Sequence, residues 1–142
     1  AAKAKTYRYR IHRGSVPDVF NRKYEYHYEK FLDVERMKQA AAYLTGTHDF
    51  TSFCGNKKMK KSAVRTVYAI TFTEEGDDLF IDFRGTGFLQ NMIRILTGTL
   101  IEVGDGRRKP EEIPDMLAQK NRECAGYTAP AQGLMLMNVE YE

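Results

Sequence analysis

The sequence predicts a single α+β domain, and three observations support this prediction. The chain has 142 residues, the usual size of one domain, and a hydrophobic fraction of 42% suffices for one core. Some segments alternate polar and apolar residues with the period of a strand, and others show helical spacing. Their order is strand, helix, strand, strand, helix, strand, which is typical of the ferredoxin-like, split βαβ arrangement. We therefore expect a mostly antiparallel sheet with two main helices on one face, a short extra helix, and a bare second face.

The first part of the chain contains two alternating segments. TYRYRI, residues 6–11, places tyrosines and isoleucine on one side and arginines on the other, which predicts a strand. Residues 13–22 are a loop with glycine, proline and asparagine. YEYHYEK, residues 24–30, alternates again and predicts a short strand or edge segment. Its three tyrosines are expected to pack across strands rather than to stack on bases.

A helix is predicted from the stretch DVERMKQAAAYLTG, residues 33–46. Asp33 is a good N-cap and Gly46 closes the helix, while the apolar residues share one face: Val34, Met37, Ala41 and Leu44. The next residues, 47–62, have no sustained period and are interpreted as a long connection.

The second part of the chain begins with a predicted hairpin, in which AVRTVYAITF and LFIDFRG flank the turn TEEGDD. A helix is expected from Gly87 to about Gly104. A short or kinked helix follows Pro110, because Pro114 interrupts it. A loop over residues 126–133 leads to a closing strand, LMLMNVEYE.

The predicted helix that begins GFLQNMIRILTG is apolar on most of its circumference but carries Arg94. On a helical wheel, six residues lie nearest to Arg94, and all of them except Ile101 are polar or small. They are Gly87, Gln90, Asn91, Thr97, Gly98 and Ile101. Arginine is almost never buried without a partner. Arg94 either pairs with an internal carboxylate such as that of Asp82, extends to water, or is held for a phosphate or a catalytic carboxylate.

The composition excludes several classes of protein. No apolar run approaches the roughly 20 residues of a membrane span, and the N-terminus lacks a signal-peptide pattern. Two cysteines and three histidines show no disulfide or zinc spacing, so we expect reduced thiols, no metal, and a cytoplasmic protein. A net charge of +3 is compatible with nucleic-acid binding without requiring it.

Five motifs together resemble one known family. GFLQNMIRILTGTLIEVGDGRRKPEEIP, AGYTAPAQGLMLMNVEYE, KTYRYRI, GTHDFTSF and VRTVY are similar, in order, to the C-terminal half of the bacterial TruA tRNA pseudouridine synthases. Gln90 and Asn91 stand where the family often has histidine or tyrosine, and Tyr127 stands where it usually has proline. The family's Arg-Thr-Asp-x-Gly-Val-His motif, which holds the catalytic aspartate, does not occur in this sequence. The resemblance therefore implies that residues 1–142 are one C-terminal domain and that the N-terminal half with the catalytic aspartate is absent.

The resemblance also implies the roles of two residues. Arg94 matches the active-site arginine that pairs with the catalytic aspartate, and Tyr7 matches the active-site tyrosine that stacks on the target base. The family converts uridine to pseudouridine on the 3′ side of the tRNA anticodon stem-loop, at positions 38–40 of the tRNA. It uses no cofactor and works as a homodimer. The resemblance further implies that the nucleophilic aspartate must come from outside this chain.

Further polar residues are candidates for RNA contact. The loop NKKMKK contributes four lysines, which are either phosphate contacts or a solvated loop. The complete set of candidates is Arg8, Arg10, Lys57, Lys58, Lys60, Lys61, Gln90, Asn91, Arg107 and Arg108. A second function stays open, that of a non-catalytic ferredoxin-like module for RNA binding or dimerisation.

Overall fold

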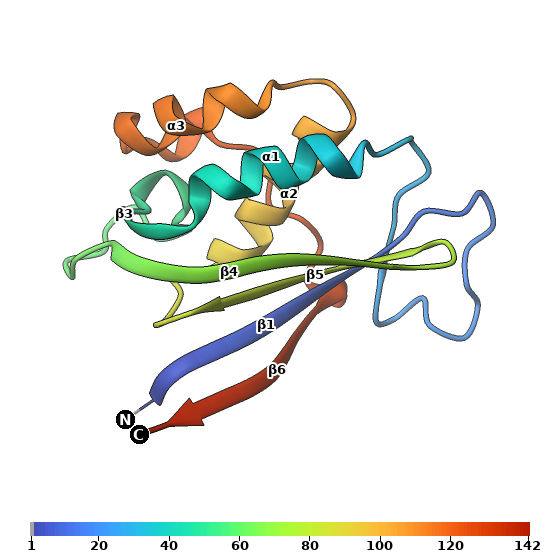
Figure 1. Cartoon of the computed structure of the whole chain (residues 1–142), viewed down its shortest axis with the longest axis horizontal. Helices are drawn as coiled ribbons and strands as arrows, with labels where there is room; N and C mark the ends of the chain where they lie inside the picture. Colours follow the sequence, from blue (N-terminus) through green and yellow to red (C-terminus); the bar gives the residue numbers. More distant parts are fainter. Residues whose placement is uncertain (1) are drawn as a thin grey trace.

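A computed structural model describes residues 2–142 as one six-stranded mixed sheet with three α-helices (Figure 1). The strands are β1 (Ala2–His12), β2 (Tyr26–His27), β3 (Gly46–Asp49), β4 (Val64–Glu75), β5 (Asp78–Gly85) and β6 (Leu134–Tyr141). The helices are α1 (Val34–Leu44), α2 (Met92–Gly104) and α3 (Ile113–Gln119), and all three lie on the same side of the sheet (Figure 1). The predicted α+β class is confirmed.

The strand order is β2-β1-β5-β4-β3, and β6 pairs with β1 on the side opposite β5. Two strands therefore share one side of β1: β6 pairs antiparallel with Ala2–Tyr9, and β2 pairs in parallel with Ile11 and His12. All other pairings in the described sheet are antiparallel. The first residues of β1 lie beside the last residues of β6, so the two ends of the chain are close together (Figure 1).

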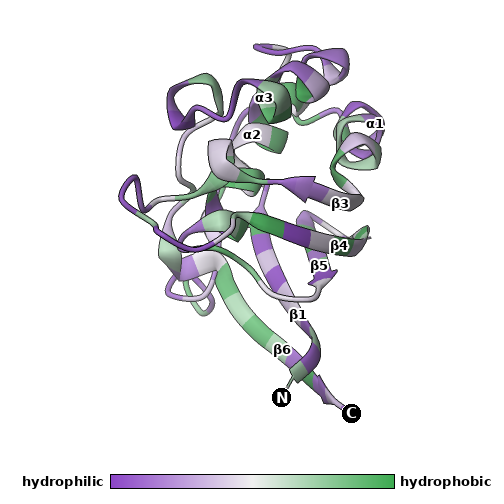
Figure 2. Ribbon diagram, turned by 90° about the vertical axis from the view of Figure 1, so that its left-hand side faces the viewer, coloured by the Kyte–Doolittle hydropathy of each residue, from purple (hydrophilic) through white to green (hydrophobic). Residues whose placement is uncertain are grey.

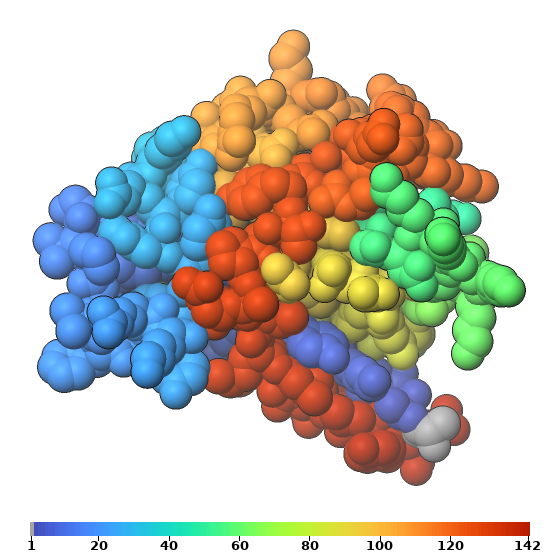
Figure 3. Space-filling view, turned by 180° about the vertical axis from the view of Figure 1, so that it is seen from behind, coloured from blue at the N-terminus to red at the C-terminus, as the bar shows by residue number. Residues whose placement is uncertain are grey.

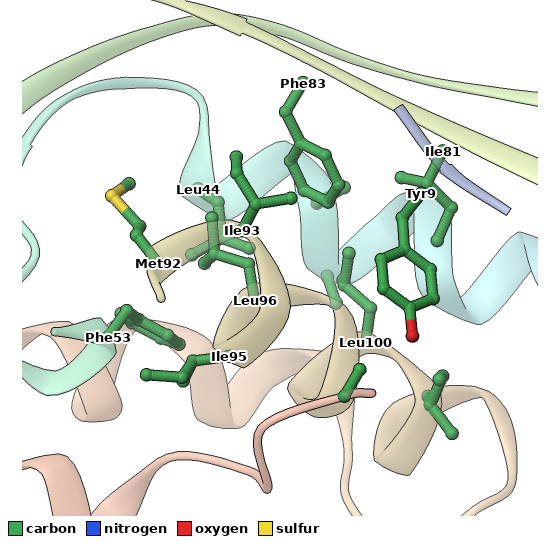
Figure 4. Packing of buried hydrophobic residues seen from close by; sticks show 14 of the residues in the cluster. Tyr9, Leu44, Phe53, Ile81, Phe83, Met92, Ile93, Ile95, Leu96 and Leu100 are labelled. Carbon is green, nitrogen blue, oxygen red and sulfur yellow. The ribbon is translucent and has the colours of Figure 1, made fainter. Parts of the chain in front are cut away.

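The burial pattern of strand β5 shows which face of the sheet the helices cover. Along β5, burial alternates strictly, so that Leu79, Ile81 and Phe83 are fully buried while their neighbours lie on the opposite face. Phe83 and Ile81 point toward α2, together with Tyr9 of β1 (Figure 4). Figure 2 shows that the other face of the sheet is not covered by any helix.

Helix α1 follows its sequence prediction. The Asp33 side chain accepts a hydrogen bond from the backbone N–H of Arg36, as an N-cap should. The predicted apolar face is buried at Met37, Ala41 and Leu44. After the helix ends, Gly46 has a φ of +102°, a conformation that side chains with a Cβ rarely adopt.

The short strand or edge segment predicted over residues 24–30 is confirmed only in part. Only Tyr26 and His27 form a strand, because β6 already occupies most of that side of β1. Glu25 is 2% exposed and Tyr24 is 61% exposed, so the alternation reflects a buried polar contact rather than a ladder of strand pairs.

The predicted start of the second main helix is wrong. Helix α2 begins at Met92, not at Gly87, because Asn91 has a left-handed backbone with a φ of +59°. Residues 87–90 form a non-helical connection in which Phe88 packs edge-on against Tyr7. The predicted long connection over residues 47–62 is partly ordered, since β3 within it pairs with β4.

The predictions for the short helix after Pro110 and for the closing strand are confirmed. The seven-residue helix α3 carries its proline in the first turn and follows a short 3-10 turn that starts at Pro110. The closing strand β6 is present. Across residues 2–142, no helix combines the length and the hydropathy needed to span a bilayer.

A candidate active site at the start of helix α2

The structure brings the two predicted catalytic residues into one pocket. Tyr7 of β1 and Arg94 of the first turn of α2 both line a cavity of about 140 Å³. Phe88, Asn91 and Leu134 contribute further walls. Small-molecule sites usually exceed about 300 Å³, so this cavity has room only for a group smaller than a typical ligand.

The Arg94 side chain is held from one side. Its Nε donates a hydrogen bond to the backbone oxygen of Ala129 at 2.7 Å, and its Nη1 donates to Oδ1 of Asn91 at 3.3 Å. The backbone oxygen of Arg94 in turn accepts from the N–H of Ala129 at 3.0 Å. These contacts orient the guanidinium by neutral groups and leave its charge without a carboxylate counterpart.

Among the ion pairs formed within residues 2–142, none includes Arg94. The alternative pairing with Asp82 is wrong. The Asp82 carboxylate instead accepts two hydrogen bonds from Arg8, at 2.8 and 3.0 Å, on the open face of the sheet. Helix α2 packs on the other face, so its arginine does not share that partner.

The segment of residues 125–130 covers the helix next to Arg94. A Cβ built on Gly98 would lie 1.8 Å from the backbone oxygen of Tyr127, so only glycine allows this approach. The N–H of Gly126 donates to the Thr99 hydroxyl at 2.9 Å. The sequence analysis placed Gly98 among the small residues near Arg94, and in the structure the chain's own backbone fills the space beside it. The consequence is a fixed position for Ala129.

Two tyrosines of β1 have different surroundings. Tyr7 is half-buried, and its ring meets that of Phe88 edge-to-face at a centroid distance of 5.6 Å. Tyr9 is fully buried and donates a hydrogen bond from its hydroxyl to the backbone oxygen of Pro130 at 2.6 Å. Burial raises the pKa of Tyr9, which therefore remains a neutral donor. Tyr9 anchors the covering segment, and Tyr7 lines the cavity.

The candidate RNA contacts fall into two groups. The four loop lysines, at positions 57, 58, 60 and 61, are exposed, as are Gln90 and Asn91. The arginines are already paired with carboxylates: Arg8 with Asp82, Arg10 with Asp78, Arg107 with Asp105 and Arg108 with Glu102. Arg108 also donates to the backbone oxygens of Cys124 and Ala125, which gives it a structural role.

A compact charged cluster lies at the far end of β1. His12 Nδ1 lies 2.7 Å from an Asp78 carboxylate oxygen, and its Nε2 lies 2.9 Å from the backbone oxygen of Val16. Both neighbours are hydrogen-bond acceptors, and this arrangement favours an imidazole that is protonated on both nitrogens. The Asp78 hydrogen bond accordingly raises the pKa of His12, and burial raises the pKa of nearby Glu25.

These three side chains place possible ligand atoms within 4.8 Å of one another. The two carboxylates, however, already face two cations, the imidazolium of His12 and the guanidinium of Arg10. The cluster is balanced in charge, and we assign no metal to it.

The sequence interpretation missed the contacts that position Arg94. Ala129 has no side-chain chemistry that could have marked it, and Gly98 was visible only as a small residue on a helix. Asn91 carried a signal, since asparagine tolerates the left-handed backbone found just before α2.

The fold and the pocket define a class of protein: an α+β domain in which a tyrosine lines one small cavity together with an arginine that has no carboxylate partner among residues 2–142. The chain belongs to the tRNA pseudouridine synthase family, whose sequence profile matches residues 40–142. Over its full length it is 51% identical to tRNA pseudouridine synthase A of Bacillus licheniformis and 48% identical to that of Bacillus subtilis. It is 50% identical over 137 residues to the Brevibacillus brevis protein of the same name, with 96% of the chain covered. The chain spans 56–58% of the length of these relatives.

Proposed function

We propose that this chain is the C-terminal domain of a TruA-type tRNA pseudouridine synthase and that it supplies Tyr7 and Arg94 to the active site. The observation that carries the proposal is their meeting in one cavity, although 87 positions of sequence separate them. Arg94 is oriented by Ala129 and Asn91 but has no carboxylate partner within residues 2–142. Such an arginine is suited to receive a carboxylate from another part of the enzyme.

The proposed reaction is an isomerisation of uridine. The bond between the ribose C1′ and the uracil N1 breaks, and a bond between C1′ and C5 forms. The proton on C5 is lost, and N1 gains one. The target nucleotide must first leave the stack of bases to reach the enzyme. Arg94 keeps the nucleophilic aspartate ionised, and Tyr7 lies against the base and assists the proton transfer at C5.

The small volume of the Tyr7–Arg94 cavity supports a site that another domain completes. The outer strand β6 also exposes apolar side chains, at Met135, Leu136 and Met137, where a further domain would bury them. Figure 2 shows β6 as a largely hydrophobic strand at the bottom of the sheet. We assign the catalytic aspartate to that further domain, and a homodimer to the complete enzyme.

Finer features of the fold support the same family. The four long strands lie in the order β6-β1-β5-β4, and α1 and α2 connect β1 to β4 and β5 to β6. We interpret this core as the ferredoxin-like, split βαβ arrangement, with β2 and β3 as additions at its edges.

The substrate is tRNA, with uridines on the 3′ side of the anticodon stem-loop as targets. Exposed polar residues supply the RNA contacts, chiefly the four lysines of residues 57–61 together with Gln90 and Asn91. Phosphate contacts of this kind give affinity without sequence preference. The arginines at positions 8, 10, 107 and 108 come second as RNA contacts, because each is already paired with a carboxylate.

The test is turnover of the complete enzyme on tRNA labelled with tritium at C5 of uridine. Arg94→Lys keeps the positive charge but loses the planar fork that binds a carboxylate, and Arg94→Ala removes both. Each should lower the rate of tritium release on the order of 10²-fold, while tRNA binding falls much less. Residues 1–142 alone should release none. Full turnover by a folded Arg94→Ala enzyme, or release by the isolated chain, would show that the assignment is wrong.

A further inference from the structure

The largest cavity described lies outside the Tyr7–Arg94 pocket. It has a volume of about 480 Å³ and forms between the loop of residues 54–63 and the turn of residues 120–122. Two of the four loop lysines, Lys57 and Lys61, line it, whereas Lys58 and Lys60 do not. The turn contributes Lys120 and Arg122 from a distant part of the sequence. The fold therefore gathers four cationic side chains around one cavity.

Only one carboxylate opposes these charges. Asp49 lines the cavity and lies 3.8 Å from the Nζ of Lys120. It also accepts hydrogen bonds from the N–H and the hydroxyl of Thr51, which lower the pKa of Asp49. Within residues 2–142, the remaining three cations take part in no ion pair. The cavity thus carries an excess of positive charge.

Both sides of the cavity are hydrogen-bonded to sequence neighbours of the residues that orient Arg94. On one side, the N–H of Gly55 donates to the backbone oxygen of Gln90 at 2.8 Å, next to Asn91. On the other side, Arg122 donates to the Thr128 hydroxyl at 3.1 Å, next to Ala129. In the view of Figure 3, the segment before α2 lies between the loop of residues 54–63 and the segment of residues 125–130. A ligand in the cavity would therefore lie beside the nucleotide bound at Arg94.

We propose that this basic cavity binds a backbone phosphate of the RNA strand next to the target nucleotide. The inference rests on the proposed function and adds a specific site to it. No aromatic residue lines the cavity, so it has no platform on which a base could stack. Its lysines, hydroxyls and amides match phosphate oxygens, which position an RNA without reading its sequence. The polar lining includes Asn56, Ser62 and Asn121.

The loop offers a matched pair of variants. Lys57→Ser with Lys61→Ser removes two charges from the cavity, and Lys58→Ser with Lys60→Ser removes two charges from the same loop outside it. All four lysines are exposed, so neither double substitution should affect folding. Circular dichroism checks this expectation. Binding of an anticodon stem-loop RNA is measured by fluorescence anisotropy between 0.05 and 0.3 M salt. Each lost phosphate contact should lower the salt slope by about 0.7 to 0.9. The cavity pair should weaken binding roughly 10- to 50-fold at about 0.1 M salt, and the outer pair by less.

A second readout locates the phosphate. Neutral methylphosphonate linkages are placed one at a time along the RNA strand. For the unmodified protein and for the variant with Lys58→Ser and Lys60→Ser, a neutral linkage at one or two adjacent positions near the target uridine should weaken binding. For the variant with Lys57→Ser and Lys61→Ser, the same neutral linkages should weaken binding no further, because the lysines that contact this phosphate are already removed.

Two outcomes would overturn the assignment. If both double variants weaken binding equally, or if the cavity variant remains sensitive at the same linkages as the unmodified protein, the cavity does not hold a phosphate. Neither result affects the proposed enzyme, which is judged by tritium release. If the complete enzyme shows no turnover on tRNA, the proposed function is wrong whatever the loop binds.

Discussion

The replacement of Gly98 by alanine should show how tightly the covering segment determines the position of Arg94. The added Cβ would lie 1.8 Å from the Tyr127 oxygen and 2.8 Å from its carbonyl carbon. Distances under 3.0 Å are essentially never observed for a Cβ, so the backbone must move by about 1 Å or more. A shift of that size is incompatible with the two hydrogen bonds between Ala129 and Arg94, at 2.7 and 3.0 Å.

The expected cost follows from these contacts. Overpacking costs about 1–3 kcal/mol, and each lost hydrogen bond about 1 kcal/mol. Alanine recovers up to about 1 kcal/mol of helix preference. The free energy of unfolding should therefore fall by about 2–5 kcal/mol. For a chain of this length, that lowers Tm by roughly 6–20 °C. Thermal and urea unfolding of the 142-residue chain measure both quantities.

Gly104→Ala is the matched control in the same helix. There the new Cβ would meet side chains rather than backbone, at 2.8 and 2.9 Å from the sulfur and Cγ of Met37 and at 3.1 Å from Cδ2 of Leu32. The flexible methionine can move, so the free energy of unfolding should stay within about 1 kcal/mol of the original. The reasoning is refuted if Gly98→Ala is as stable as this control. In the complete enzyme, Gly98→Ala should also slow tritium release more than it weakens tRNA binding.

Three further changes test other contacts. Asn91→Gly retains the left-handed backbone but loses the hydrogen bond to Arg94, so the rate of tritium release should fall several-fold with little loss of stability. Asn91→Ala should in addition lower the free energy of unfolding by about 1 kcal/mol. Because Asp78 raises the pKa of His12, the stabilisation is complete below the ordinary value near 6.5 and is lost as pH rises through the folded pKa. Urea unfolding should therefore show His12→Gln to be more destabilising at pH 6 than at pH 9, and an equal effect at both would contradict the charged imidazole. Ser52 is fully buried and donates to a backbone oxygen at 2.6 Å, so Ser52→Ala should lower the free energy of unfolding by about 1–3 kcal/mol, and an unchanged urea midpoint would contradict that role.

Local periodicity was enough to predict most of the fold. The alternation of TYRYRI and LFIDFRG identified β1, β5 and their buried faces, because a strand with one covered face must alternate. The N-cap at Asp33 and the apolar spacing after it identified α1 for a similarly local reason. The family motifs identified Tyr7 and Arg94 as site candidates, and the structure places both in one cavity.

Contacts between distant segments decided the rest. Asn91 leaves the helix because Phe88 packs on Tyr7 and because Gly55 bonds to Gln90, none of which a helical wheel contains. One of the two groups that orient Arg94 is a backbone oxygen 35 residues away, and a backbone group carries no signal in the sequence. The sequence by itself determined most of the strands and helices, because these depend largely on neighbouring residues, but not strand β3 or the start of α2. The positions of the charged side chains depend on which segments meet in space, and only the tertiary structure decided that.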